Sequence, residues 1–81
     1  MDNLEETITL MTSDNYKDRF VAEYRQLSIR CAKLGNAIRR AKAGEFSFNC
    51  PLKLIDLQYV TMIQYMAILQ ERASIEGISL E

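Results

Sequence analysis

Two runs of apolar residues, each alternating in steps of three and four, leave this 81-residue chain few ways to fold. The first run lies within residues 15–43 and comprises Phe20, Tyr24, Leu27, Cys31, Leu34, Ile38 and Ala41. The second lies within residues 51–75 and comprises Leu52, Ile55, Tyr59, Met62, Met66, Leu69 and Ala73. A heptad pattern of this kind places its side chains on one stripe of an α-helix. We predict two long helices, over residues 15–43 and 51–75, that pack through these stripes.

The short segment between the two runs predicts how the helices are joined. Gly44 follows the first run, and glycine readily adopts the left-handed conformation that ends many helices. Pro51 opens the second run, where its fixed φ suits a first helical residue. A turn this short favours antiparallel helices, and we expect Phe46 and Phe48 to fold inward from it and cover one end of the core. The predicted fold is an all-α antiparallel helical hairpin, with residues 1–81 as a single domain.

Smaller features complete the prediction of local structure. In residues 1–12, apolar residues at helical spacing predict a short N-terminal helix or a partly ordered arm. The polar residues 12–15 then offer side chains that cap the next helix. Gly77 is placed to end the second long helix. Gly35, inside the first, costs about 1 kcal/mol relative to alanine, which suggests either a close approach of another backbone or ligand, or a tolerated accident.

The second long helix is apolar well beyond its heptad stripe. Its additional apolar residues are Leu54, Leu57, Val60, Ile63, Ala67 and Ile68. A hairpin alone would leave these side chains in water, and exposed patches of that size normally mark an interface. A chain this short also buries only a modest core by itself. We therefore expect a homo-oligomer; coverage of part of this surface by the N-terminal segment is the alternative.

Positive charge is concentrated in the first long helix, although the net charge of the chain is −1. Between residues 25 and 42 there are six basic residues and no acid: Arg25, Arg30, Lys33, Arg39, Arg40 and Lys42. Such a strip favours an anionic partner. Because acids flank the strip at both ends, a small anion fits the limited charge better than DNA or RNA, whose binding usually needs a broad basic face.

Arg30 and Lys33 are the leading candidates for contact with that anion. They are three residues apart, so they share one face of the helix and can point at one phosphate. Arginine also bonds phosphate through two parallel hydrogen bonds. Tyr16 and Tyr65 offer flat rings for base stacking and hydroxyls for a phosphate or a ribose. The other two tyrosines fall on the heptad stripes, where we expect them in the core.

The residues that most enzymes need are missing from this sequence. There is no histidine, the acids form no paired motif, and three isolated glycines cannot build a phosphate-binding loop. Two cysteines are too few for a closed metal site, so we expect no metal, no cofactor and no catalysis. No apolar run approaches the roughly 20 residues of a membrane span, and no signal peptide is recognisable. We expect a cytoplasmic protein whose Cys31 and Cys50 stay reduced.

Several segments of the helices carry a recognisable pattern. They are residues 22–27 (AEYRQL), 30–34 (RCAKL), 57–69 (LQYVTMIQYMAIL) and 72–78 (RASIEGI). This pattern resembles a family of short phage-encoded proteins related to a crAss-like phage open reading frame. The same size and layout are similar to phage sponges, which are oligomeric helical hairpins that withhold cyclic nucleotide signals from CBASS or Thoeris defence. The resemblance implies a pocket with a tyrosine early in the first long helix and a lysine farther along it, for which Tyr16 and Lys33 are the nearest matches.

The leading hypothesis is a phage immune-evasion protein that sequesters a cyclic nucleotide signal, of the cyclic di- or trinucleotide or cyclic ADP-ribose type, without catalysis. Tyr16 and Tyr65 would contact the base or ribose, while Arg30, Lys33 and Arg72 would neutralise phosphates. One alternative is an inhibitor or adaptor that binds a host protein through the apolar surface of the second helix. A weaker alternative is a small nucleic-acid-binding accessory protein.

Overall fold

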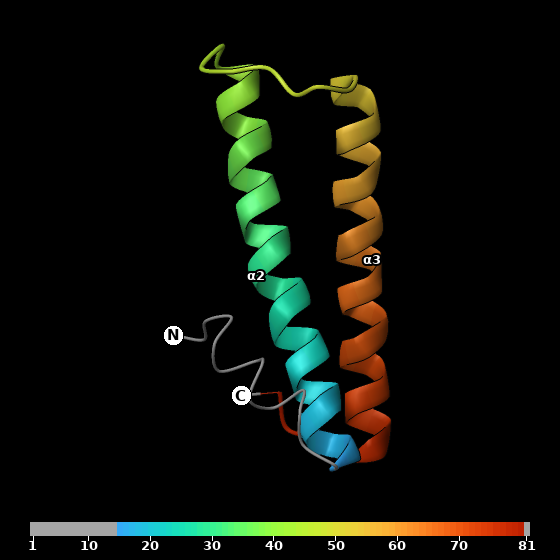
Figure 1. Ribbon diagram of the computed structural model, residues 1–81. Helices are drawn as coiled ribbons and strands as arrows, with labels where there is room; N and C mark the ends of the chain where they lie inside the picture. Colours follow the sequence, from blue (N-terminus) through green and yellow to red (C-terminus); the bar gives the residue numbers. More distant parts are fainter. Residues whose placement is uncertain (1–14, 81) are drawn as a thin grey trace.

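The computed structural model describes residues 15–80, which form two long helices, α2 (Tyr16–Lys42) and α3 (Leu52–Glu76). The helices run antiparallel and pack side by side, joined by one turn (Figure 1). The predicted helical hairpin is therefore confirmed. The short helix or arm expected for residues 1–12 lies outside the described residues.

The two ends of α2 follow from the residues that flank it. The Asn15 side chain accepts hydrogen bonds from the backbone N–H groups of Lys17 at 2.8 Å and Asp18 at 3.3 Å, so it satisfies two donors that the first turn leaves unpaired. After Lys42 the chain turns through Gly44, whose φ of 83° lies in the left-handed region. The next residue, Glu45, donates its N–H to the Arg40 carbonyl at 3.0 Å, which closes the helix end.

The ends of α3 differ slightly from the prediction. Pro51 precedes the helix instead of opening it, because its ψ of 137° is extended while its carbonyl accepts the first backbone hydrogen bonds of the helix. At the other end Gly77 adopts a φ of 69°, and Ile78 donates its N–H to the Ala73 carbonyl at 2.8 Å. This left-handed ending turns the chain back, so that Ile78 becomes part of the core.

The interior of the hairpin is the meeting of the two heptad stripes, and none of their residues is exposed. The most deeply buried cluster lies at the open end, away from the turn. Its members are Phe20, Leu69, Ala73 and Ile78, with Val21, Tyr24, Leu27 and Leu80 packed against it. Cys31, Ile38 and Ile55 continue the buried line along the hairpin. Both cysteines are free, Cys31 buried and Cys50 exposed.

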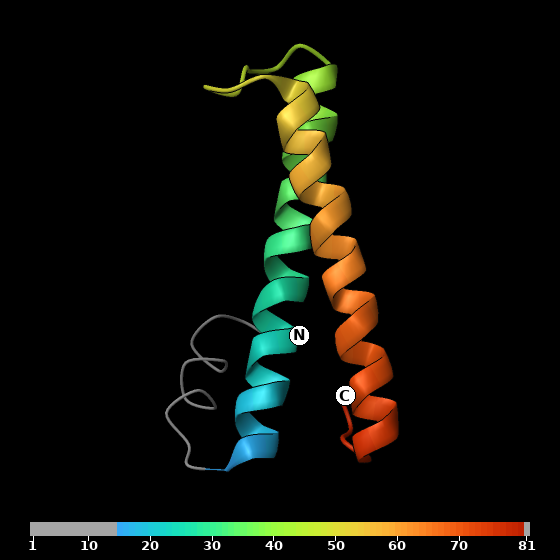
Figure 2. The same cartoon turned by 90° about the vertical axis from the view of Figure 1, so that its right-hand side faces the viewer.

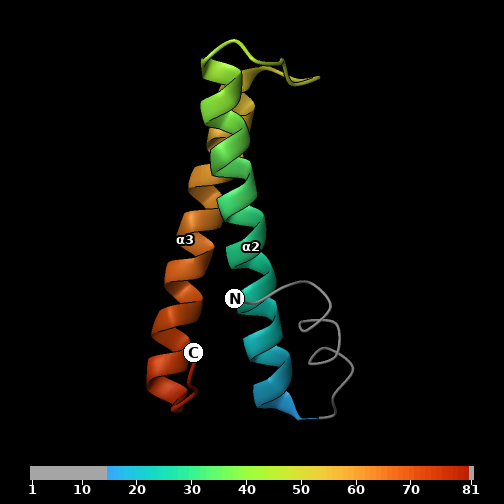
Figure 3. The ribbon, with the colours of Figure 1, turned by 90° about the vertical axis from the view of Figure 1, so that its left-hand side faces the viewer.

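Two contacts fix how α2 and α3 are aligned. The Tyr59 ring lies against Gly35 so closely that a Cβ atom there would be 2.9 Å from its Cε1 and Oη atoms. Nearer the open end, Gln70 Nε2 donates to the Tyr24 hydroxyl at 2.7 Å. Of the two readings of Gly35, the structure supports a close approach, but of a tyrosine ring rather than of a backbone or ligand. Viewed from the two sides, the helices cross at a shallow angle (Figure 2 and Figure 3).

The prediction for Phe46 and Phe48 holds only in part, because Phe48 is half-buried whereas Phe46 is exposed. Their rings pack edge to face against each other, with centroids 5.0 Å apart, and Phe46 remains 37% exposed. The Arg40 guanidinium lies 5.7 Å from the centre of the Phe46 ring. Mutual contact and a cation–π contact thus hold the two rings in the turn, outside the core.

Candidate ligand-binding site

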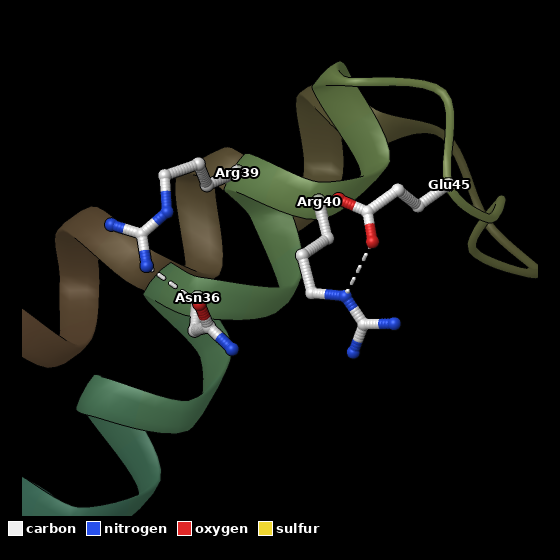
Figure 4. Close-up of polar contacts among 4 residues, drawn as sticks. All are labelled: Asn36, Arg39, Arg40 and Glu45. Carbon is white, nitrogen blue, oxygen red and sulfur yellow. Dashed lines mark hydrogen bonds and ion pairs between the residues drawn. The ribbon is translucent and has the colours of Figure 1, made fainter.

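The basic residues at the end of α2 are held by their neighbours. Arg39 Nη2 donates to Asn36 Oδ1 at 2.6 Å, and Arg40 Nε lies 3.2 Å from Glu45 Oε1 (Figure 4). Lys42 Nζ lies 3.8 Å from Asp56 Oδ2 on α3. All three cations also lie in the last turn of α2, where the helix dipole favours positive charge. This end of the basic strip is explained by the structure of the hairpin itself.

Arg30 and Lys33 are different, because neither side chain has a hydrogen bond or ion pair within residues 15–80. Both line a groove between the helices of about 380 Å³, which we call the basic groove. The other residues of the basic groove are Leu34, Ala37, Gln58 and Met62. Two uncompensated cations therefore face an otherwise apolar hollow that contains one amide. This arrangement can hold an anion that also has an apolar part.

A second groove of about 470 Å³ adjoins the first on the α3 side, and we call it the apolar groove. It is lined by Leu54, Leu57, Gln58, Thr61, Met62 and Tyr65. Gln58 and Met62 line both grooves, so the two hollows form one continuous surface. Each groove has the volume of a typical small-molecule site. Tyr65, which is 42% exposed, is in place to stack on a flat group held there.

Tyr16 and Arg72 lie together at the open end of the hairpin. Arg72 Nη2 donates to the Tyr16 hydroxyl at 2.9 Å, and that hydroxyl donates to Glu76 Oε1 at 2.9 Å. Arg72 Nε also lies 3.5 Å from Glu76 Oε2, and the guanidinium lies 5.0 Å from the centre of the Phe20 ring. The charge of Arg72 is thus already compensated, and this open-end cluster ties the start of α2 to the end of α3.

The five residues predicted for the site therefore fall in two places. Arg30, Lys33 and Tyr65 border the joined grooves, whereas Tyr16 and Arg72 form the open-end cluster. Tyr16 and Lys33 are 17 residues apart on α2, a separation of about 25 Å along the helix axis. One hairpin does not bring these two into a single pocket.

Sequence reasoning missed the α3 residues at the centre of the grooves, Gln58 and Met62. The heptad spacing predicts Met62 in the contact between the helices, and Gln58 stands out in the sequence only as part of the family pattern. The available signal was their spacing, because residues four apart lie on one face of a helix, with Gln58 just outside the stripe that packs on α2.

A family model described as Sequestin matches residues 14–75 of the chain. The chain belongs to the Sequestin family. The matched residues include all of α2, nearly all of α3 and every residue that lines the two grooves. The family name denotes sequestration, which agrees in general terms with the sponge resemblance. No curated protein and no solved structure matches the chain.

The described part of the chain contains neither a membrane-spanning helix nor a metal-binding group of side chains. Neither α2 nor α3 is long and apolar enough to cross a membrane. Within residues 15–80, no group of His, Cys, Asp and Glu side chains could hold a metal ion.

Proposed function

We propose that this member of the Sequestin family binds and withholds a small anionic signal of the cyclic nucleotide class, without catalysis. In this proposal it is a phage immune-evasion protein that acts in the cytoplasm of the bacterial host. The ligand is a cyclic dinucleotide, a cyclic trinucleotide or a relative of cyclic ADP-ribose. The observation that carries the proposal is the pair of uncompensated cations, Arg30 and Lys33, beside an apolar groove.

The chemistry of the joined grooves suits both halves of a nucleotide. Arg30 and Lys33 supply a planar fork and a mobile ammonium group for phosphate oxygens. The apolar groove and the Tyr65 ring offer a surface for a base, whose face stacks on aromatic side chains. Gln58 lies between these two regions, where its amide can donate to and accept from a base or a ribose.

The composition of the groove lining supports binding rather than turnover. The residues that line the two grooves include no carboxylate, thiol or imidazole. These are the groups that general acid–base and nucleophilic catalysis most often uses, although lysine, threonine and tyrosine, which the lining does contain, can also act. Recovery of intact ligand is therefore part of the test.

The test is a thermal-shift panel of cyclic dinucleotides, cyclic trinucleotides and cyclic ADP-ribose isomers. A ligand at about one hundred times its Kd stabilises the folded form by about 2.7 kcal/mol, which raises the Tm of a domain this small by roughly 10–20 °C. Intact ligand should be recovered by mass spectrometry after heat denaturation. No shift with any ligand of the panel would refute the proposal, and recovery of a cleaved product would replace sequestration by catalysis.

A matched pair of variants tests the residue assignment. Lys33→Ala removes an uncompensated cation from the basic groove and should abolish most of the ligand-induced shift. Arg39→Ala removes the same charge from the same helix, but this guanidinium is bonded to Asn36 and lines neither groove. Arg39→Ala should leave the shift unchanged. Equal loss in both variants would mean that only overall charge matters.

The exposed apolar surface of α3 supports a second candidate, an inhibitor or adaptor of a host protein. Ile63 is 45% exposed and lines neither groove, so Ile63→Asp should then abolish capture of that host protein while leaving a ligand-induced thermal shift intact. The nucleic-acid alternative predicts retardation of DNA or RNA that weakens steeply as salt rises.

A further inference from the structure

The exposed apolar side chains of α3 form a second stripe outside the contact with α2, and Thr61 lies at its middle. We call this set the outer stripe: Leu54, Leu57, Thr61, Tyr65 and Ile68. The four large side chains are 55%, 61%, 42% and 56% exposed, respectively. At 3.6 residues per turn these five positions fall within about 80° of the helix circumference. Together they expose roughly 400 Å² of apolar surface, the size at which a patch on a soluble protein marks an interaction site.

The spacing of the residues in the outer stripe is the same whether it is read from the N-terminal or the C-terminal end of α3. From Leu54 the steps are three, four, four and three, so Thr61 is the centre of a symmetrical pattern. A second copy of α3 turned end for end would therefore bring its Ile68 level with Leu54 and its Tyr65 level with Leu57. A surface that complements itself under such a rotation is the property of a two-fold, isologous dimer.

Two unpaired charges select the antiparallel orientation. Lys53 and Glu71 lie on the same flank of the outer stripe near its opposite ends, and neither has an ion pair or hydrogen bond within residues 15–80. In antiparallel helices the same flanks meet, so Lys53 of one copy would lie within about 3 Å along the axis of Glu71 of the other. The pair would form twice by symmetry. Parallel helices would set opposite flanks together and leave both charges unpaired.

Thr61 is suited to the point where the two helices would cross. Its side chain is short, which lets two backbones approach. Its hydroxyl donates to the Leu57 carbonyl of its own helix at 2.8 Å, so burial at a dimer axis would leave no unpaired donor.

From these observations we propose that two copies of this chain pair through α3, antiparallel, about a two-fold axis at Thr61. The symmetrical stripe, the complementary flanking charges and the short central side chain each point to the same axis. In this proposal a second copy of the chain covers the outer stripe.

This pairing covers Leu54, Leu57 and Thr61 of each apolar groove and leaves Gln58, Met62 and Tyr65 open on the side of α2. It joins these open parts and the two basic grooves into one trough. Gly35 lies against Tyr59 and Tyr24 bonds Gln70, so between these contacts Lys33 lies level with Thr61. Under the two-fold rotation both α2 helices lie on the same side of the paired α3 helices. The two Lys33 residues then lie level with each other at the height of the axis, and the two Arg30 residues lie about one turn above and one turn below it. Gln58 and Tyr65 of both copies form the floor of the trough.

The trough deepens the function proposed above and rests on it. Four cations related by a two-fold axis match an anion with two phosphates in a ring, the chemistry of a cyclic dinucleotide, better than an anion with one phosphate. The expected stoichiometry is one such ligand per two chains. A ligand that contacts both copies also strengthens the dimer, because binding and pairing are thermodynamically linked.

Charge reversal tests the pairing without any ligand. The full chain is compared by sedimentation equilibrium with the variants Lys53→Glu and Glu71→Lys and with the variant that carries both. Each single reversal places like charges together twice and should weaken the dimer roughly tenfold. The double reversal restores both pairs and should recover most of the affinity. A monomer at high concentration, or single and double variants that behave alike, would overturn the proposal.

Cross-linking tests the axis directly. In a Cys50→Ser background, Thr61→Cys should form a disulfide-linked dimer on oxidation, because the two residues at a two-fold axis meet. Ile63→Cys is the matched control: Ile63 is also exposed, at 45%, but lies on another face of α3 and should not cross-link. Cross-linking of both variants alike, or of Ile63→Cys alone, would refute this axis. If the parent chain is a monomer and captures a host protein that Leu57→Asp does not capture, the outer stripe binds that protein and not a second copy.

Calorimetry with cyclic di-AMP or cyclic di-GMP separates this inference from the proposed function. One ligand per two chains supports the shared trough. One ligand per chain with the dimer intact refutes the trough and leaves the pairing standing. A dimer that binds no ligand of the panel refutes the proposed function and leaves the pairing standing.

Discussion

Substitution of Gly35 by alanine sets two opposing effects against each other. In a helix interior alanine is more favourable than glycine by about 1 kcal/mol. The new Cβ atom, however, would lie 2.9 Å from Cε1 and Oη of Tyr59 and 3.0 Å from its Cζ, so the ring must move. Overpacking of this kind costs about 1–3 kcal/mol. The rigid ring presents three atoms to the new methyl group, so we expect the steric cost to exceed the helix gain.

The expected net effect of Gly35→Ala is a loss of about 1 kcal/mol, measured as a fall in Tm of about 4–8 °C at fixed protein concentration. The matched background is Tyr59→Leu, which lacks the three ring atoms that the methyl group meets. There the same alanine should stabilise the protein, because only the helix gain remains. Stabilisation in the parent chain, or the same sign in both backgrounds, would refute the argument that the Tyr59 ring requires a glycine.

Three further substitutions test the ends of the hairpin. Asn15→Ala removes the side chain that accepts two backbone N–H groups and should cost about 1 kcal/mol in chemical denaturation. Gly77→Ala places a Cβ atom at a φ of 69° and should lower the free energy of unfolding by about 1–2 kcal/mol. The Ile78 amide should then be less protected from hydrogen exchange. An unchanged denaturation midpoint in either variant would contradict the expectation for that variant. Tyr16→Phe removes the hydroxyl between Arg72 and Glu76 and should lower stability by less than about 1 kcal/mol while leaving ligand binding unchanged. Loss of ligand binding in Tyr16→Phe would show that the Tyr16 hydroxyl is part of the ligand site.

Most of the fold could be predicted because its determinants are local. The heptad spacing alone placed the two helices, and the conformations favoured by Asn15, Gly44 and Gly77 placed their ends. The turn was predicted less well. Phe46 and Phe48 pair with each other, and sequence spacing does not say whether two neighbouring rings prefer each other or the core.

The candidate site was predicted only in part, since it depends on which flanks of the two helices meet. The shared face of Arg30 and Lys33 follows from their spacing, and both line one groove. The contribution of Gln58 depends on the rotation of α3 against α2, which the contact between Gly35 and Tyr59 helps to set. The pairing of Arg72 with Glu76 was visible as a spacing of four residues, but its hydrogen bond to Tyr16 depends on the fold.

The uneven distribution of the core has a consequence for how the molecule moves. Leu69 is fully buried among Phe20, Ala73 and Ile78 at the open end, so the start of α2 and the end of α3 are held together most firmly there. The half of the hairpin nearer the turn, which contains the basic groove, has fewer buried side chains to hold its helices together. Amide protons in that half should therefore exchange faster than those at the open end, because fewer buried contacts oppose local separation of the two helices there.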